Sequence, residues 1–229
     1  MIARVVSNLV YSSSCTVYGQ PEILPVTEQT PFQEAECPYA NTKKICEDII
    51  RDTMVSGANI RAIALRYFNP IGAHPSGYIG ELPLWVPENL VPYVTQAAAG
   101  LREKITVFGN DYDTVDGSCV RDYIHVMDLA DAHIKALEYL AKQEEAPFYD
   151  VFNAGVGRGY SVLELIHAFE EVNDLKLKYE IGKRREGDIT QIYADTRKIA
   201  SILQWEAKRD LKEALRDAWR WQENLGKMS

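Results

Sequence analysis

The amino-acid sequence predicts an α/β fold: part of a doubly wound, mostly parallel sheet, with a smaller α/β domain attached. Three observations support this prediction. Apolar runs of strand length alternate with longer segments of helical periodicity, and no internal repeat or low-complexity tract interrupts them. With 229 residues, 46% of them hydrophobic, the chain can bury the core of one domain or one and a half. Strands that alternate with helices form right-handed βαβ units, whose strands are parallel.

The first third of the chain predicts two buried strands with a loop and a helix between them. The apolar run NLVYSS at residues 8–13 is typical of a buried strand, and three prolines after it predict a loop. A helix is expected at about residues 39–54, because Pro38 precedes it and Gly57 follows it. Its expected apolar side carries Ile45, Ile49 and Ile50. The run IRAIALRYF at residues 60–68 predicts the second strand.

The rest of the chain predicts four helices and three short strands. Ser161 and Glu164 form a capping box at the start of one helix. Leu211, Leu215 and Trp219 form an apolar stripe on the last one. The helices are expected at about residues 88–99, 128–142, 161–172 and 211–224, and the strands at 105–108, 122–126 and 149–153.

Composition argues against several classes of function. The formal charge is −8 and no basic stripe is present, so nucleic acid is not an expected partner. No apolar run approaches a membrane span, and the first residues do not resemble a signal peptide. The four cysteines lack CxxC spacing and the four histidines lack ligand spacing, so neither a metal site nor a disulfide framework is expected. These features favour a soluble protein of the reducing cytoplasm.

Tyr39 and Lys43 are the first candidate site residues. Their spacing places a phenol and an ammonium on one face of the predicted helix. A second pair at this spacing, Tyr179 and Lys183, lies at a predicted strand end, so the spacing alone does not indicate a site. The context is more specific. Ser14 ends the first strand, and ligands of doubly wound sheets bind outside the carboxyl ends of the strands.

Five segments in fixed order carry a resemblance to a known family: SSSCTVYG at 12–19, PYANTK at 38–43, RYFNPIGAHPSG at 66–77, VRDYIHVMDLADAH at 120–133 and REGD at 185–188. Together they resemble the UDP-galactose (UDP-glucose) 4-epimerases, which are extended short-chain dehydrogenase/reductases. The resemblance implies a Rossmann-like fold. Residues 1–70 would form part of an NAD-binding domain. Residues 71–229 would mainly bind the UDP-sugar, with some segments returning to the sheet.

The resemblance also implies a cofactor, substrates and roles for three residues. The cofactor is NAD, and the substrates are UDP-glucose and UDP-galactose. Tyr39 as a phenolate would take the proton of the sugar 4-hydroxyl while C4 passes a hydride to NAD; the 4-keto sugar then turns over and is reduced on its other face. A free tyrosine has a pKa near ~10, so a cation such as Lys43 is needed to favour the phenolate. Lys43 would also hold the nicotinamide ribose, and Ser14 would hydrogen-bond the 4-oxygen.

Further contacts follow from the same resemblance. Tyr67 and Phe68 would line the nicotinamide, although both suit a core position equally well. The implied substrate contacts, besides Ser14, are Asn69, Asn89, Leu90, Phe108, Arg121, Arg185, Asp188 and Ile192. Asn89 at a helix start and the two arginines would bind phosphate oxygens. Full-length relatives form homodimers, partly through the helix that bears the tyrosine, so a homodimer is implied once the fold is complete.

Purely structural roles remain open as alternatives for several of these residues. Asn89 also suits a plain helix cap, Phe108 a core aromatic, and Arg185 a solvated member of the basic run at 183–185. The segment GVGRG at 155–159 is one residue short of a dinucleotide fingerprint, and we interpret it as a tight turn.

Related sugar-nucleotide 4,6-dehydratases carry an Asp–Glu pair after the active-site hydroxyl. Here Cys15 and Thr16 follow Ser14, and neither supplies a carboxylic acid, so dehydration is not expected. The resemblance also implies that Ile192 occupies the position that limits the pocket for N-acetylated sugars. Because it is smaller than tyrosine, interconversion of UDP-GlcNAc and UDP-GalNAc is an open alternative.

The sequence departs from the family in one respect. No Gly-rich turn for the dinucleotide pyrophosphate precedes Tyr39. Met1 would lie just before a middle strand of the sheet, so we expect a fragment that lacks the N-terminal dinucleotide-binding half. The alternative function is therefore a catalytically incompetent remnant that binds UDP-sugar through Asn89, Arg121 and Arg185.

Overall fold

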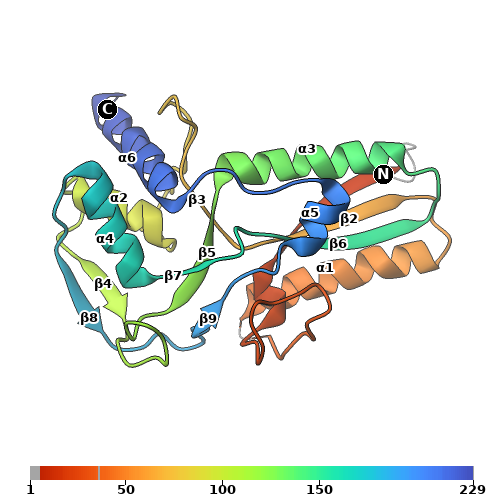
Figure 1. Cartoon of the computed structure of the whole chain (residues 1–229), viewed down its shortest axis with the longest axis horizontal. Coiled ribbons are helices and arrows are strands. Elements are labelled where there is room, and N and C mark those ends of the chain that lie inside the picture. Colours follow the sequence, from red (N-terminus) through yellow and green to blue (C-terminus); the bar gives the residue numbers. More distant parts are fainter. Residues whose placement is uncertain (1–5, 36, 229) are drawn as a thin grey trace.

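The computed structural model describes residues 6–35 and 37–228, so the expected chain start at Met1 lies outside the described part. The molecule has two lobes (Figure 1). One is a parallel sheet between helices, and the other is a smaller lobe in which helices pack on a two-stranded sheet. The predicted α/β class, with a parallel sheet and an attached α/β part, is confirmed.

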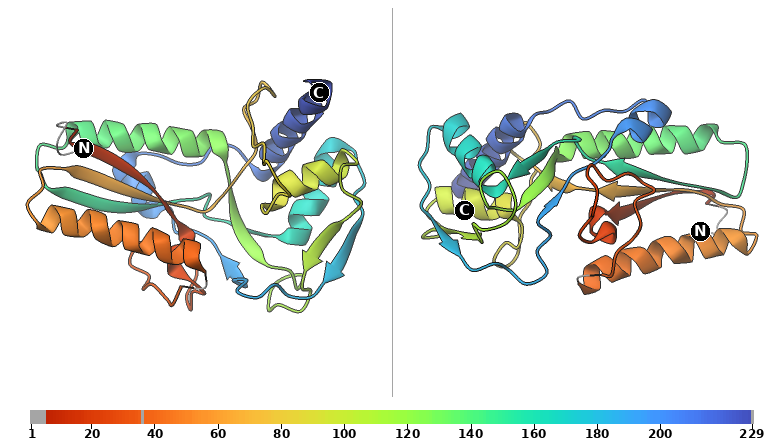
Figure 2. Two further views of the ribbon diagram at one scale, coloured as in Figure 1. Left: turned by 180° about the vertical axis from the view of Figure 1, so that it is seen from behind. Right: turned by 60° about the horizontal axis from the view of Figure 1, so that its bottom comes forward.

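The sheet of the larger lobe has three parallel strands in the order β1-β2-β6: β1 (Asn8–Ser14), β2 (Arg61–Tyr67) and β6 (Phe148–Ala154). Helices cover both faces, as a doubly wound sheet requires (Figures 1 and 2). One face is covered by α1 (Pro38–Val55), and the other by α3 (Val126–Lys142) and α5 (Arg197–Leu203). The strand register aligns Ser14 with Tyr67, so the carboxyl ends of β1 and β2 form one edge.

The smaller lobe encloses a second core, which includes Val94, Ile105, Leu165, Phe169 and Leu215. Its elements are α2 (Leu90–Ala98), β4 (Ile105–Phe108), α4 (Val162–Asn173), β8 (Tyr179–Gly182) and α6 (Leu211–Met228). A mixed sheet lies between the lobes and is made of β3 (Asn69–Ile71), β5 (Val120–His125), β7 (Gly159–Ser161) and β9 (Gln191–Ile192).

The predicted helices and long strands are present, and the short elements are the ones that the sequence did not predict. A 3₁₀ helix at Cys15–Tyr18 follows β1 directly, and α5 spans only seven residues. The Ser161–Glu164 capping box is confirmed in both directions, at 2.9 and 2.7 Å. Within the described residues, no helix is long and apolar enough to cross a membrane.

The expected apolar side of α1 is confirmed only for Ile50, which packs against the buried cluster of Met54, Ile60 and Ala62. Ile45 and Ile49, expected to face the core, are 48% and 57% exposed. The buried positions of α1 are Ala40, Glu47 and Met54, seven residues apart. The cause is Glu47, which is buried because it pairs with Arg66 of β2 and so turns Ile45 and Ile49 outward.

Candidate active site

Tyr39 and Lys43 lie one turn apart near the start of α1, beside the end of β1. The Lys43 Nζ atom is 5.4 Å from the centroid of the Tyr39 ring and donates a 2.6 Å hydrogen bond to the Ser12 carbonyl oxygen. Tyr39 is 54% exposed, and within the described residues its hydroxyl has no hydrogen-bond partner. We call this pair the dyad. Its phenol is therefore open to a ligand while its ammonium is held by the strand.

Ser12 also connects the dyad to β2. Its hydroxyl accepts a 2.7 Å hydrogen bond from the Tyr67 hydroxyl, which also contacts Nε2 of His133 on α3. Burial raises the pKa of Tyr67, the neighbouring Tyr39 raises it further, and the bond to Ser12 lowers it. Because the net shift is upward, Tyr67 remains a neutral hydrogen-bonding phenol at physiological pH.

Ser14 is buried at the same edge, as the last residue of β1. It caps the 3₁₀ helix, since its Oγ accepts hydrogen bonds from the Thr16 backbone nitrogen at 3.2 Å and the Thr16 hydroxyl at 3.0 Å. A serine hydroxyl has two acceptor lone pairs and one donor hydrogen. Ser14 is thus fixed in place by its acceptor side and keeps its O–H to donate.

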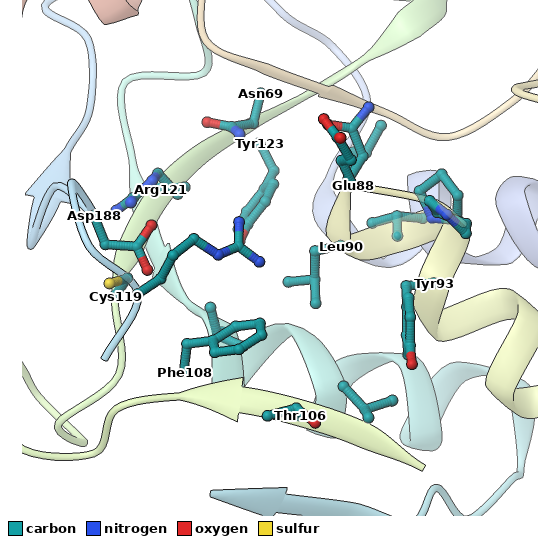
Figure 3. Close-up of a pocket in the computed structure, with 18 of the residues that line it drawn as sticks. Asn69, Glu88, Leu90, Tyr93, Thr106, Phe108, Cys119, Arg121, Tyr123 and Asp188 are labelled. Carbon is teal, nitrogen blue, oxygen red and sulfur yellow. The ribbon is translucent and has the colours of Figure 1, made fainter. Parts of the chain in front are cut away.

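A pocket of about 760 Å³ opens between β3, β5, β4 and the start of α2 (Figure 3). Seven of the predicted substrate contacts line this large pocket: Asn69, Asn89, Leu90, Phe108, Arg121, Arg185 and Asp188. Other lining residues were not predicted, among them Glu88, Tyr93, Cys119 and Tyr123. Tyr123 lies in the motif that contains Arg121, and alternation along β5 places both on the pocket side of the chain, a signal that the sequence offered.

Two adjacent arginines near the pocket have different surroundings. The Arg185 guanidinium lies 4.5 Å from the centroid of the Phe108 ring, a pocket residue. Arg184 instead lies 4.2 Å from the centroid of the Tyr112 ring and donates a 2.7 Å hydrogen bond to Asp111. Of these two arginines, only Arg185 lines the pocket, although its side chain is exposed.

Asn89 precedes the first residue of α2, yet its side chain does not cap the helix. Its amide nitrogen donates a 2.9 Å hydrogen bond to Oε1 of Glu81, and the residue lines the pocket. The plain capping alternative is therefore not realised.

Phe68 and Ile192 occupy buried positions away from the pocket lining. Both pack in an apolar cluster with Cys15, Val17 and Tyr18. These three residues belong to the 3₁₀ helix that directly follows Ser14. Burial raises the pKa of the Cys15 thiol to about 12. The position next to Ser14 therefore offers a neutral thiol where a dehydratase needs an acid.

The GVGRG segment is a turn held by Asp122 of β5. The Asp122 carboxylate accepts hydrogen bonds from the backbone nitrogens of Val156, Gly157 and Ala194, at 2.8, 2.9 and 3.1 Å. A Cβ on Gly155 would lie 2.5 Å from Oδ2 of this carboxylate, so glycine is required there. The interpretation as a tight turn is confirmed, and its backbone donors are used by the protein itself.

Comparisons with known proteins agree on one family. Residues 3–218 match the family model described as GDP-mannose 4,6 dehydratase. The chain is 51% identical over 217 residues to the UDP-glucose 4-epimerase of Bacillus subtilis, covering 95% of this chain and 63% of that protein. It is 52% identical to UDP-glucose 4-epimerase 2 of Arabidopsis thaliana, with coverages of 95% and 61%.

Solved structures give the same result. The UDP-glucose 4-epimerase of Stenotrophomonas maltophila, crystallised with NAD and formylated UDP-arabinopyranose, has a TM-score of 0.94 at 45% identity, covering 98% of this chain and 66% of that one. The enzyme of Bifidobacterium longum, in complex with NAD+ and UDP, has a TM-score of 0.91 at 43% identity, with coverages of 96% and 64%. The chain thus spans slightly less than two thirds of the length of these relatives. It belongs to the extended short-chain dehydrogenase/reductases, in the family of the GDP-mannose 4,6 dehydratase model, where its relatives include the UDP-glucose 4-epimerases.

Proposed function

We propose that this chain carries the catalytic and UDP-sugar-binding part of a UDP-glucose 4-epimerase, which interconverts UDP-glucose and UDP-galactose with NAD as cofactor. One observation carries the proposal: the strand end beside the dyad continues directly into the lining of the large pocket. Tyr67 is tied to the dyad through Ser12, and Asn69, two residues later, lines the pocket. Two residues of extended chain span about 7 Å. A nucleotide held in the pocket would thus extend its sugar toward Tyr39.

The groups beside the dyad fit the nicotinamide-ribose half of NAD. The Lys43 ammonium has three N–H donors, of which the Ser12 carbonyl takes one, so two remain for ribose hydroxyls. The half-exposed Tyr39 ring leaves room beside them. When bound, NAD supplies the acceptor and donor of the hydride at C4 of the sugar.

Side chains of this protein then transfer the proton of the 4-hydroxyl and hydrogen-bond the 4-oxygen. Tyr39 takes the proton of the 4-hydroxyl, and the positive charge of Lys43 stabilises the phenolate. Ser14 donates its O–H to the 4-oxygen, because its acceptor side is already used by Thr16. After the keto sugar turns over, C4 presents its opposite face to the returning hydride, and Tyr39 returns the proton to the 4-oxygen.

The pocket residues hold the nucleotide throughout the cycle. Arg121 and Arg185 bind the diphosphate, for which guanidinium forks are suited. Phe108 stacks near the uracil, and the Asn89 amide donates to a phosphate oxygen from the start of α2. Asp188 accepts from a ribose or uridine hydroxyl. Because these groups keep the nucleotide in place, only the sugar has to rotate.

A second candidate function is binding of UDP-sugar without turnover. It is supported by the large pocket, which gathers Asn89, Arg121 and Arg185. It uses the same pocket and differs only in the lack of hydride transfer.

Finer points belong to the same proposal. Acceptance of N-acetylated hexoses is supported by a UDP-Glc/GlcNAc 4-epimerase of Campylobacter jejuni, which is 34% identical with a TM-score of 0.76. Ile192 does not line the pocket and gives no support of its own. The exposed Ile45, Ile49 and Val55 on α1 support a homodimer through that helix. We assign the protein to the cytoplasm, with neither nucleic acid nor membrane as a partner.

The test is an assay of the purified chain with UDP-galactose and added NAD, together with isothermal titration with UDP. We expect conversion to UDP-glucose, with at least about 100-fold less for Tyr39→Phe. UDP binding without any conversion selects the second candidate. Full activity of Tyr39→Phe refutes the role of Tyr39 as the base.

A further inference from the structure

Glu47 of α1 and Arg66 of β2 form a buried ion pair beneath the dyad helix. Glu47 is 1% exposed and Arg66 4%. The guanidinium donates two hydrogen bonds to the carboxylate, Nε to Oε1 at 3.0 Å and one terminal nitrogen to Oε2 at 2.7 Å. Apolar side chains of similar volume stabilise a core as well as such a pair or better, because the charges lose their hydration. Stability alone therefore does not explain why a buried ion pair is present here. A need to hold α1 and β2 in one defined arrangement does explain it.

Surrounding groups fix that geometry. A second terminal nitrogen of Arg66 donates to the Tyr18 hydroxyl at 2.9 Å, which donates in turn to Oδ1 of Asn153 at 2.6 Å. The Ser13 hydroxyl donates to Oε1 of Glu47. The contacts come from β1, β2, β6 and the 3₁₀ helix, so α1 is attached to three strands at one point. A fully satisfied buried network of this kind favours one arrangement of its parts.

Two adjacent residues of β1 hold two residues one turn apart on α1. The Ser13 hydroxyl holds Glu47, and the Ser12 carbonyl holds the Lys43 ammonium at 2.6 Å. Lysine and glutamate at this spacing on a helix attract each other. Because Ser13 and Arg66 occupy the Glu47 carboxylate, Lys43 is left to bind Ser12 beside Tyr39.

We propose that Ser13, Glu47 and Arg66 are positioning residues for the Lys43 ammonium. They fix the end of β1 against α1 and keep Lys43 from pairing with Glu47. The purpose of this arrangement rests on the proposed function, since a correctly placed Lys43 serves Tyr39. The observed contacts of Lys43 do not depend on the proposed function. They can therefore be tested by a measurement that requires no enzymatic turnover.

The measurement is the ¹⁵N NMR signal of the Lys43 ammonium, assigned with Lys43→Arg. Ammonium protons held in a hydrogen bond exchange slowly enough with water to be observed. We expect the signal in the wild type and in Ser13→Thr, which keeps the hydroxyl, and its loss in Ser13→Ala. Should Ser13→Ala fail to fold, Glu47→Asp withdraws the carboxylate from Ser13 by one methylene, keeps the charge for Arg66, and should also lose the signal.

Ile63→Val is the matched control, because it truncates a buried side chain of β2 outside the network. We expect it to lower the melting temperature and leave the Lys43 signal intact. If the wild type converts UDP-galactose, Ser13→Ala should also lower kcat about 10-fold with KM nearly unchanged, and Ser13→Thr should restore kcat. Absence of turnover in the wild type refutes the proposed epimerase activity. The NMR result then decides the positioning role by itself. A Lys43 signal that is missing in the wild type, or that persists in the folded variants, overturns the positioning role.

Discussion

Replacement of Arg185 by alanine should weaken UDP binding by about 10- to 150-fold. The pocket holds Arg185 stacked on Phe108 at 4.5 Å, so its fork is prepositioned for the diphosphate. A hydrogen bond to a charged group contributes about 1.5–3 kcal/mol, which converts to this range of affinity. Phe108→Leu removes the cation–π contact, worth about 0.5–1 kcal/mol at an exposed site, and also the proposed stacking near the uracil, so it should weaken binding by at least about 2- to 5-fold. Isothermal titration with UDP measures both effects.

Arg184→Ala is the matched control for this experiment. Arg184 is the next residue in the same basic run, but it pairs with Asp111 at 2.7 Å and does not line the pocket. It removes the same net charge, so any general electrostatic loss appears in both variants and decreases with added salt. If Arg184→Ala weakens UDP binding as much as Arg185→Ala, the reasoning from the stacked geometry is refuted.

Three further predictions concern catalysis and stability. Lys43→Met should lower kcat at least about 100-fold in the epimerase assay while the UDP affinity stays within about twofold, because Lys43 does not line the pocket. A parallel loss of UDP binding contradicts this prediction. Burial raises the pKa of Asp122 to about 6 from 3.8, so between these values the folded chain binds a proton that the unfolded chain has lost. Through this group the free energy of unfolding should fall by about 2 kcal/mol from pH 4 to pH 6. Urea titrations should show a smaller fall in Asp122→Asn. Gly155→Ala should lower the free energy of unfolding by about 1–3 kcal/mol, since its Cβ would lie 2.5 Å from Asp122 and 2.9 Å from Ala194; an unchanged melting temperature contradicts the steric argument.

The parts of the fold that could be predicted were those with strong local signals. The strand and helix of the first third follow from an apolar run and from the Pro38 and Gly57 boundaries, and the structure has a helix at Pro38–Val55. Four pocket residues were predictable because they lie in segments whose order is specific: Asn69, Arg121, Arg185 and Asp188. Short elements such as β9, with two residues, lack any such signal.

The remaining features depend on contacts between distant residues. Glu47 is a charged residue that a helical pattern places outside, and only its pairing with Arg66 explains its burial. Tyr67 and Phe68 are adjacent aromatics that the sequence could not distinguish. The structure directs Tyr67 to Ser12 and packs Phe68 in a buried cluster, because successive side chains of an extended segment point to opposite sides.

The central claim is that the dyad and the large pocket act on one UDP-sugar by oxidation and reduction at C4. The most direct test follows UDP-galactose deuterated at C4 by NMR, with added NAD in ordinary water. The account predicts UDP-glucose that keeps the deuterium at C4 in the wild type and no conversion in Tyr39→Phe. Replacement of the label by solvent hydrogen, or no conversion in the wild type while UDP binds, would contradict it.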